Sequence, residues 1–512
     1  MTIRRRALGR GWFRAALLAV AVLPTGAHAV RTQEDNPRLT LGETLNQAQA
    51  ALNANNCAGA LSQVDPVLAR DDFGTLPDQA KIPFLTIAAI CELRDGDNDA
   101  ALAHSLAASE LPGAPALVWR FRFGLQAQTG DHEAAVTTLE QMQALDLDSW
   151  SEIDPDWIFT LNRQFRREQK YSPLHVRLLA LVSRPGFPPA RTKVGFDWLR
   201  LSYARYLARN ADTERARTVI GNLRLAYALR DASLDPDVRA LLPDDFDLRA
   251  ATEKQLAMFK TMEKERPSLL ANTLEVAGTL RSLGQPAKAV EVLEAARPYG
   301  ALEKMFTDRD DRINWWWDEL ARAYEQLGRY EDAAAAYRQA IAEGESGDPG
   351  HNVSQVINLG YLQHRFGHDK EALETLTRME SATNKYASPY GRMEFHLAHG
   401  CAAWSLGRKA AAEKDLVYAR EHKDDHPQAL RNLYGCMDDM DSAAAEVIRQ
   451  LEDPDKRIDA LSWLSQYDDP DAGVPPDPFR SQAKALRERA DVKAAIDKAG
   501  GIRRFHVVAS GL

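Results

Sequence analysis

The sequence predicts an all-α protein built as a solenoid of antiparallel helix pairs. Apolar and small residues recur three and four positions apart over most of the chain, which is the period of a helix, and no block of alternating strand residues interrupts them. A glycine followed five residues later by an alanine also recurs. Successive alanines of this pattern, Ala289, Ala333, Ala372 and Ala412, are 44, 39 and 40 residues apart. A repeat of this length indicates stacked helix pairs rather than one large core.

The segment 317–340 contains one repeat almost in full. Its first half places large side chains on one helix face, and Gly328 can end that helix with a positive φ. The second half repeats the pattern around Ala333, where a small side chain lets two helix backbones approach closely. One pair cannot bury its own apolar face, so neighbouring pairs must cover it. The residues concerned are Trp317, Leu320, Ala321, Tyr324, Gly328, Tyr330, Ala333, Tyr337 and Ala340.

These residues resemble the tetratricopeptide repeat (TPR) family, whose unit is a helix-turn-helix of about 34 residues. The sequence departs from the family pattern at Ala321, where glycine is usual, and it lacks a proline shortly after the second helix. The resemblance implies a right-handed superhelix that binds partners or stacks into assemblies and carries no chemistry of its own.

Further segments extend the repeat along the chain. Five repeat the glycine and alanine pattern: 85–108, 119–142, 273–296, 356–379 and 396–419. Four more are weaker helix pairs: 40–69, 157–182, 197–229 and 427–451. The chain is therefore expected to hold about ten helix pairs.

Two proline-containing segments, 183–189 and 234–247, interrupt the repeats, and we expect the curvature of the stack to change at both. The capping helix is expected at 479–499, with residues 502–510 extended over the last pair. The predicted division of the chain is a signal peptide at 1–29, an N-terminal helical-repeat lobe at 30–230, a break at 231–250, a C-terminal TPR lobe at 251–467, a linker at 468–478, and a capping helix with a tail at 479–512.

Residues 1–29 are typical of a secretory signal peptide. Five arginines accompany an apolar run at 15–23, and Ala27-His28-Ala29 is a small-x-small cleavage site. The apolar run is too short to span a bilayer comfortably, and an uncleaved anchor is the alternative. We expect an exported protein, periplasmic or secreted, with no membrane span in the mature chain.

The charge argues against two classes of partner. The net charge of −9 includes five arginines and no acids in residues 1–29, so the remainder carries −14, which is −9 minus 5. Nucleic acid and anionic membrane surfaces repel such a chain. No phosphate loop, GxGxxG, GxSxG or CxxC motif occurs, so the sequence predicts neither a cofactor nor a catalytic residue.

Export permits disulfides, and the four cysteines divide into two candidate pairs. Cys57 opens the second helix of one pair and Cys91 ends the first helix of the next, so antiparallel stacking favours a bridge between them. Cys401 and Cys436 are expected on successive first helices, roughly 9 to 10 Å apart, which is wider than a disulfide tolerates. Two small core residues are the alternative to that second bridge.

The resemblance also implies a partner-binding groove. In the family, the second, fifth, ninth and twelfth positions of each unit line the concave wall. Here these positions and their neighbours hold aromatic and cationic residues, which favours an extended peptide, an acidic protein tail or a C-terminal carboxylate as partner. The alternative is that the tryptophans pack on neighbouring helices and the arginines remain solvated. The candidate groove residues are Arg281, Trp315, Arg322, Ile357, Asn358, Tyr361, His364, Arg365 and Trp404.

A metal site at His396 and His399 is not favoured. The two histidines lie on one helix face with Cys401 close by, but neither an HExxH order nor a further ligand is evident. Both occupy positions that pack between the helices of a pair, so a hydrogen-bonded core pair is the better interpretation. A partial HExxH begins at His132 but lacks its second histidine. We therefore predict no metal site.

Three functions are consistent with the sequence. The first is an exported scaffold that binds a protein or peptide in the cell envelope and has no catalysis of its own. The second is an accessory or enzymatic subunit with its chemistry in a degenerate region such as 157–194. The third is a self-assembling structural protein that makes contact through the end of its stack. The missing catalytic motifs favour the first.

Overall fold

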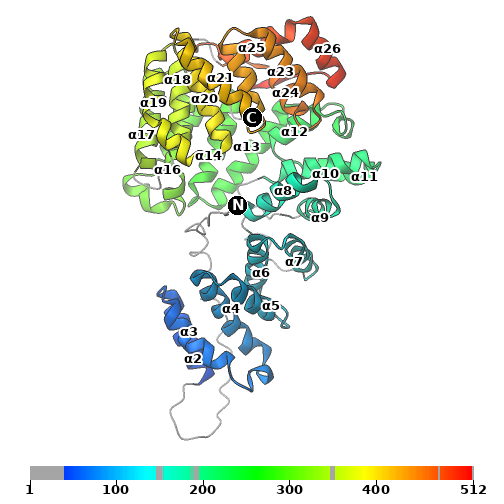
Figure 1. Cartoon of the computed structure of the whole chain (residues 1–512), viewed down its shortest axis with the longest axis vertical. Coiled ribbons are helices and arrows are strands. Elements are labelled where there is room, and N and C mark those ends of the chain that lie inside the picture. The colour runs from blue at the N-terminus through cyan, green and yellow to red at the C-terminus, as the bar shows by residue number, and fades with distance from the viewer. Residues whose placement is uncertain are drawn as a thin grey trace. The chain divides into compact units, whose positions relative to one another are not determined.

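The computed structural model describes residues 40–145, 153, 155–185, 187, 195–345, 352–470 and 473–509 (Figure 1). This part of the chain is almost entirely helical, with one short two-stranded sheet near its C-terminal end, and it confirms the predicted all-α solenoid. The predicted signal peptide at 1–29 lies outside the described residues. No helix among those described is long and apolar enough to cross a membrane.

The chain divides into two compact units, Met1–Phe196 and Asp197–Leu512. Unit one holds four helix pairs and a short 3-10 helix. Each second helix begins after an Asn, Asp or Ser whose side chain accepts a hydrogen bond from the first turn. Its elements are α2 (Leu41–Asn53), α3 (Cys57–Leu68), η1 (Phe73–Thr75), α4 (Asp78–Asp95), α5 (Asn98–Ser109), α6 (Ala116–Thr129), α7 (His132–Ala144), α8 (Pro155–Gln169) and α9 (Pro173–Val182).

Unit two holds six helix pairs, additional helices at both of its ends and the sheet. Its elements are α10 (Asp197–Arg209), α11 (Thr213–Gly221), α12 (Ala226–Leu234), η3 (Arg239–Leu241), α13 (Leu248–Glu265), α14 (Leu270–Ser282), α15 (Pro286–Ala295), η4 (Gly300–Met305), α16 (Arg309–Gln326), α17 (Tyr330–Glu345), α18 (Val353–Arg365), α19 (Asp369–Tyr386), α20 (Pro389–Ser405), α21 (Lys409–Glu421), α22 (Pro427–Cys436), α23 (Met440–Glu452), α24 (Arg457–Leu464), β1 (Gln466–Asp468), α25 (Pro478–Glu488), α26 (Ala490–Ala499) and β2 (Arg504–Val508).

The ten helix pairs of the described chain share one kind of turn. Between the two helices of each pair, one residue has a positive φ. In the six clearest repeats this residue is the predicted glycine, and φ lies between 70° and 88°. The alanine five residues later is fully buried in all six. The repeat phase inferred from the sequence is thus confirmed. The six turns are at Gly96, Gly130, Gly284, Gly328, Gly367 and Gly407.

The four weaker pairs make the same turn without glycine. The residues with positive φ are Asn55, Tyr171, Ala211 and Asp438. Asn and Asp tolerate the left-handed conformation, whereas Tyr and Ala incur a cost of roughly 1–2 kcal/mol there. A glycine in the sequence therefore does not mark these pairs, although one turn residue has a positive φ as in the other six.

Unit two closes on itself. Its early helices α12 and α13 contact its late elements α24 and β2, and a shared core joins Leu234 and Leu248 to Phe505 (Figure 1, green beside orange and red). The Arg503 guanidinium donates to the Ser233 carbonyl at 2.8 Å. Strand β1 pairs in parallel with β2, so the final strand lies between α13 and the end of the stack. Contacts more than 200 residues apart in sequence therefore hold the two ends of this unit together.

The observed boundaries differ from the predicted ones. The two units meet at residue 196, close to the interruption at 183–189, and the predicted break at 231–250 lies within unit two. The predicted capping helix at 479–499 is two helices, α25 and α26, joined at Arg489, whose backbone is extended. This bend lets both helices bury apolar side chains in the same core. The tail is extended, as expected, but it packs on α13 and α14.

A pair of opposite substitutions tests the turn. A Cβ added at Gly367 would meet open space within the described chain, so Gly367→Ala adds only backbone strain and should destabilise unit two by about 1 kcal/mol. Ala211→Gly relieves the same strain and should stabilise it by about 1 kcal/mol. Urea unfolding followed by circular dichroism measures both. Shifts of the same sign in the two variants would contradict this account of the turn.

Candidate functional site

The first helices of successive pairs in unit two lie side by side (Figure 1, green to orange). Polar side chains connect each of these helices to the next, and we call this surface the first-helix face. It is carried by α14, α16, α18, α20 and α22. Its residues are Arg281, Asp318, Glu319, Arg322, Glu325, Asn358, Tyr361, Arg365, Glu394 and Trp404.

Ion pairs and a hydrogen bond from a side-chain amide connect α14, α16 and α18. The Arg281 guanidinium donates to both carboxylate oxygens of Glu319, at 2.5 and 3.1 Å. Asp318 accepts from Arg322 and from the Asn358 amide, each at 2.7 Å. The neighbouring Asp318 carboxylate raises the pKa of Arg322, which stays charged. These arginines are therefore paired within the protein.

Glu394 lies at the centre of the connections between α18, α20 and α22. The Tyr361 hydroxyl donates to it at 2.5 Å, and His426 Nε2 lies 2.8 Å from its other oxygen. Burial acts to raise the pKa of Glu394, but hydrogen bonds from His426, Tyr361 and Tyr390 outweigh it, and the pKa is lowered. Burial also raises the pKa of Tyr361 well above its usual value, so the hydroxyl remains a donor.

Residues 473–477 cover the C-terminal end of the first-helix face, and we call them the C-terminal strap. The Pro475 carbonyl accepts from Arg365 Nε at 3.0 Å and from Nη2 at 2.8 Å. The same guanidinium donates to Glu325 at 3.0 Å. Just beyond the strap, Phe479 packs edge-on against Tyr361 with ring centroids 5.9 Å apart. The chain itself thus occupies this end of the predicted groove.

The structure bridges Cys401 and Cys436, with Cα atoms 5.2 Å apart, whereas Cys57 and Cys91 are free thiols. The sequence favoured the opposite pair. Helix axes about 9 to 10 Å apart do not exclude the observed bridge, because each Cα lies about 2.3 Å off its axis and facing Cα atoms come closer than the axes. Gly400 allows α20 and α22 to approach closely, because a Cβ at this position would lie 2.7 Å from Leu433 on the neighbouring helix.

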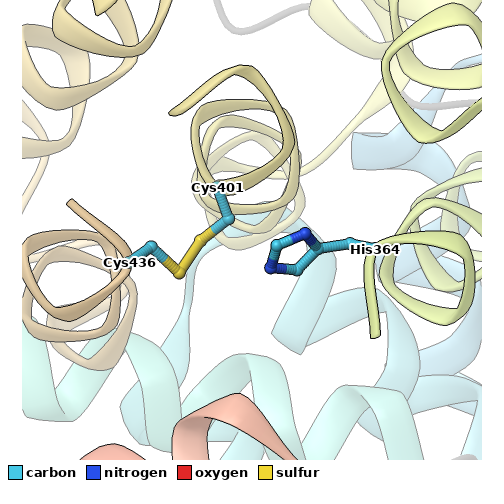
Figure 2. Close-up of side chains that lie close together, drawn as sticks. All are labelled: His364, Cys401 and Cys436. Atoms are coloured by element: carbon cyan, nitrogen blue, oxygen red, sulfur yellow. A yellow bond between two sulfur atoms is a disulfide. The ribbon is translucent and has the colours of Figure 1, made fainter. Parts of the chain in front are cut away.

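His396 and His399 bind one carboxylate between the helices of their pair. Their Nδ1 atoms lie 2.7 Å from the two oxygens of Asp415, whose side chain is almost fully buried. The interpretation as a hydrogen-bonded core pair is confirmed. His364, by contrast, lies beside the disulfide, which the sequence did not indicate (Figure 2).

A pocket of about 290 Å³ lies at the N-terminal ends of α20, α22 and α24. Arg431 is buried near it, donates to Gln450 at 2.7 Å and lies 3.9 Å from the centroid of Trp463. Sequence reasoning missed the pocket, because its residues come from helix starts and a second helix rather than from the inward positions of the repeat. It is lined by Tyr390, His426, Pro427, Gln428, Gln450, Lys456 and Asp459.

The predicted groove residues gather on neighbouring helices, but few offer a free surface. Arg281 and Ile357 are buried, and among the predicted residues Trp315 is the most exposed, at 37 %. Trp404 Nε1 donates to Asp438 at 3.3 Å, and Lys409 covers its ring at 5.2 Å. Arg281 and Arg365 are ion-paired with glutamates of neighbouring first helices, whereas Arg322 pairs with Asp318 of its own helix.

Comparison with known proteins identifies the repeat. Residues 317–349 match the family model described as tetratricopeptide repeat, over the segment where α16 and α17 form a pair. Residues 317–349 are therefore a tetratricopeptide repeat (TPR). No match was found among curated proteins.

Solved structures similar to this chain include the Cut9-Hcn1 hetero-tetramer of the APC/C, at 14% identity, a TM-score of 0.29, and coverage of 96% of this chain and 94% of the other. A Rap protein complexed with competence and sporulation factor is 13% identical, with a TM-score of 0.31 and coverage of 88% of this chain and 98% of the other. A human IFIT1 dimer with PPP-AAAA is 10% identical, with a TM-score of 0.36 and coverage of 96% of this chain and 95% of the other.

The network around Glu394 makes a pH-dependent prediction. Because its pKa in the folded protein lies below the usual 4.5, the ionised carboxylate contributes stability that is complete above about pH 4.5 and is lost as the pH falls through the lowered value. Glu394→Gln should therefore destabilise unit two at pH 7 by about 1–3 kcal/mol, and the difference from the parent should shrink at an acidic pH below the lowered pKa.

Urea unfolding at both pH values measures this difference. The matched control is Glu421→Gln, at an exposed position on α21, which should leave stability nearly unchanged at either pH. If the difference in free energy of unfolding between Glu394→Gln and the parent stays constant with pH, the charge of Glu394 does not contribute to stability.

Proposed function

We propose that this TPR protein is an exported scaffold that binds a protein or peptide partner at the pocket beside the first-helix face. The fold supports a role in protein interaction. The observation that carries the proposal is the pocket of about 290 Å³ at the N-terminal ends of the first helices, while the C-terminal strap covers the opposite end of the same face. Residues 473–477 do not line this pocket, so the C-terminal strap leaves it uncovered.

The chemistry of the pocket favours an acidic group of the partner. Lys456 lines it, and Arg431 is buried nearby with one guanidinium nitrogen, Nη2, that has no hydrogen-bond partner among the described residues. Helix α22 begins at Pro427, so the positive end of its dipole also faces this region. Lys456 donates to the exposed Asp424 carboxylate at 2.7 Å, and a partner's side-chain carboxylate or chain end could replace Asp424 there. Tyr390, which is 53 % exposed, offers ring surface at the rim.

Filling the pocket tests the proposal. Gln428→Trp places a large side chain in the pocket without removing any of the hydrogen bonds described above, and it should weaken partner binding at least about tenfold, or about 1.4 kcal/mol. Lys456→Gln should weaken the binding of an acidic partner, and the loss of affinity should be larger at low salt than at high salt. The partner is first isolated on the mature protein and identified by mass spectrometry, and its affinity is then measured by calorimetry.

The matched control is Val417→Trp, which adds the same side chain at an exposed position on the outer helix α21. It should bind the partner as the parent does. Tyr361→Ala is unsuitable as a probe because Tyr361 packs on Phe479 and holds Glu394. If Gln428→Trp binds as tightly as Val417→Trp, the pocket is not the binding site.

Export makes a separate prediction. The protein recovered from the periplasm or medium should begin at Val30, because cleavage is expected after Ala29. Intact-mass spectrometry of the fractionated protein measures this directly. Full-length protein confined to the cytoplasm would contradict export, and full-length protein in the membrane fraction would support the uncleaved anchor instead.

A further inference from the structure

Three residues from three neighbouring first helices meet at one point. His364 lies at the end of α18, Cys401 in α20 and Cys436 at the end of α22, and one side-chain atom from each lies within 4.8 Å of the others (Figure 2). We propose that the Cys401–Cys436 disulfide masks a metal site: once it is reduced, the two thiolates and the His364 imidazole bind a zinc ion. This inference does not depend on the proposed partner pocket.

The His364 ring is already held as a metal ligand would be. Its Nδ1 lies 2.5 Å from the Asp369 carboxylate, which leaves Nε2 as the ligand atom. Figure 2 shows the imidazole directed toward the two sulfur atoms. A carboxylate on the far nitrogen fixes the ring orientation and raises the basicity of the ligand, as in many zinc sites. Asp369 begins α19, so a helix pair supplies both the ligand and its support.

The cysteines are placed for the same role. Each follows a glycine, Gly400 or Gly435, which allows a neighbouring side chain to approach closely. Cys401 is buried and Cys436 is partly exposed, so a reductant would reach the bridge through Cys436. In the reduced state the sulfurs must separate to roughly 3.8 Å to bind zinc at bond lengths of about 2.3 Å, a movement that side-chain rotation can supply.

Gln482 provides a second observation at the site. Its Nε2 lies 3.8 Å from the Cys436 sulfur, while its Oε1 is buried and has no hydrogen-bond partner among the described residues. Three protein ligands leave one position of a tetrahedral zinc ion open. A water molecule in that position could donate a hydrogen bond to Gln482 Oε1, which would satisfy the buried oxygen.

The reaction balances with a dithiol as reductant. The dithiol transfers two electrons and two protons to the protein disulfide and becomes a disulfide itself, leaving Cys401 and Cys436 as thiols. Zinc binding then releases two protons as both thiols become thiolates. Two sulfur ligands and one imidazole suit zinc better than calcium or magnesium, which prefer oxygen.

The other histidines near Cys401 do not compete for this role. His396 and His399 have their Nδ1 atoms on Asp415 and stack on Tyr418 and Phe395 respectively. They belong to the contact between α20 and α21, whereas His364 belongs to the neighbouring helix α18. His399 is therefore a matched control for His364.

The test measures zinc binding by the mature full chain before and after reduction. A Cys57→Ala background removes one thiol of the second cysteine pair, which could otherwise form a competing dithiolate. The protein is reduced with a phosphine, desalted without oxygen and titrated with Zn²⁺ against a chromophoric chelator. Reduced protein should bind one zinc per chain and oxidised protein none, and Co²⁺ in place of zinc should show thiolate-to-cobalt absorption.

Variants distinguish this site from nonspecific thiol binding. In the same background, His364→Gln and Asp369→Asn should each weaken zinc binding about 10- to 100-fold, while His399→Gln should bind as the background protein does. Circular dichroism follows the fold of every reduced sample. Equal affinity in His364→Gln and His399→Gln would overturn the proposal, as would a reduced protein that binds no stoichiometric zinc, whether it stays folded or unfolds and is not restored by the metal.

Discussion

The fold depends on a close approach of helices immediately after a left-handed turn. In each of the ten pairs of the described chain the backbone reverses through one residue with positive φ, and in the clearest pairs an alanine five residues later is fully buried. Glycines set further close contacts: a Cβ at Gly360 would lie 2.9 Å from Leu376, within the same pair, and one at Gly400 would lie 2.7 Å from Leu433, in the next. Small residues therefore fix the spacing both within and between pairs.

The polar contacts of the first-helix face follow from that spacing. Once the first helices stand side by side, Glu319 meets Arg281 and Asp318 meets Asn358, each across a helix boundary. Buried ion pairs of this kind contribute little net stability compared with apolar packing, but removing one partner is costly because the other charge is left unpaired. Such contacts therefore select one register of neighbouring helices over its alternatives. Because Arg281 and Arg365 are already paired in this way, they are not available to bind a carboxylate of another molecule.

Local sequence signals were enough to predict the helix pairs. In six pairs the glycine of the turn and the following alanine act within a few residues, so Gly367 and Ala372 are evident from the sequence. The turns at Tyr171 and Ala211 carry no such signal, since there packing imposes a conformation that the residue itself disfavours.

Features that join distant segments could not be predicted in the same way. Arg503 reaches Ser233, and Arg365 reaches Pro475, through contacts without any periodic pattern in the chain. The candidate groove residues lie on neighbouring first helices, but Arg281 and Arg365 pair with glutamates about one repeat away in the chain, and no local pattern indicates those pairs. The sequence leaves the disulfide between Cys401 and Cys436 open, because the distance between two helix axes does not fix the distance between facing Cα atoms.

The closure of unit two has a consequence for how this protein can change. An open stack can lengthen or shorten by duplication or loss of a repeat, because each repeat depends only on its neighbours. Here strand β2 is anchored on α13, and the C-terminal strap before α25 is anchored on Arg365. Adding one repeat would separate both anchors from their sites at once. Gene duplication within this half of the molecule should therefore be tolerated far less than in an ordinary solenoid, and its repeat number should be preserved among related sequences.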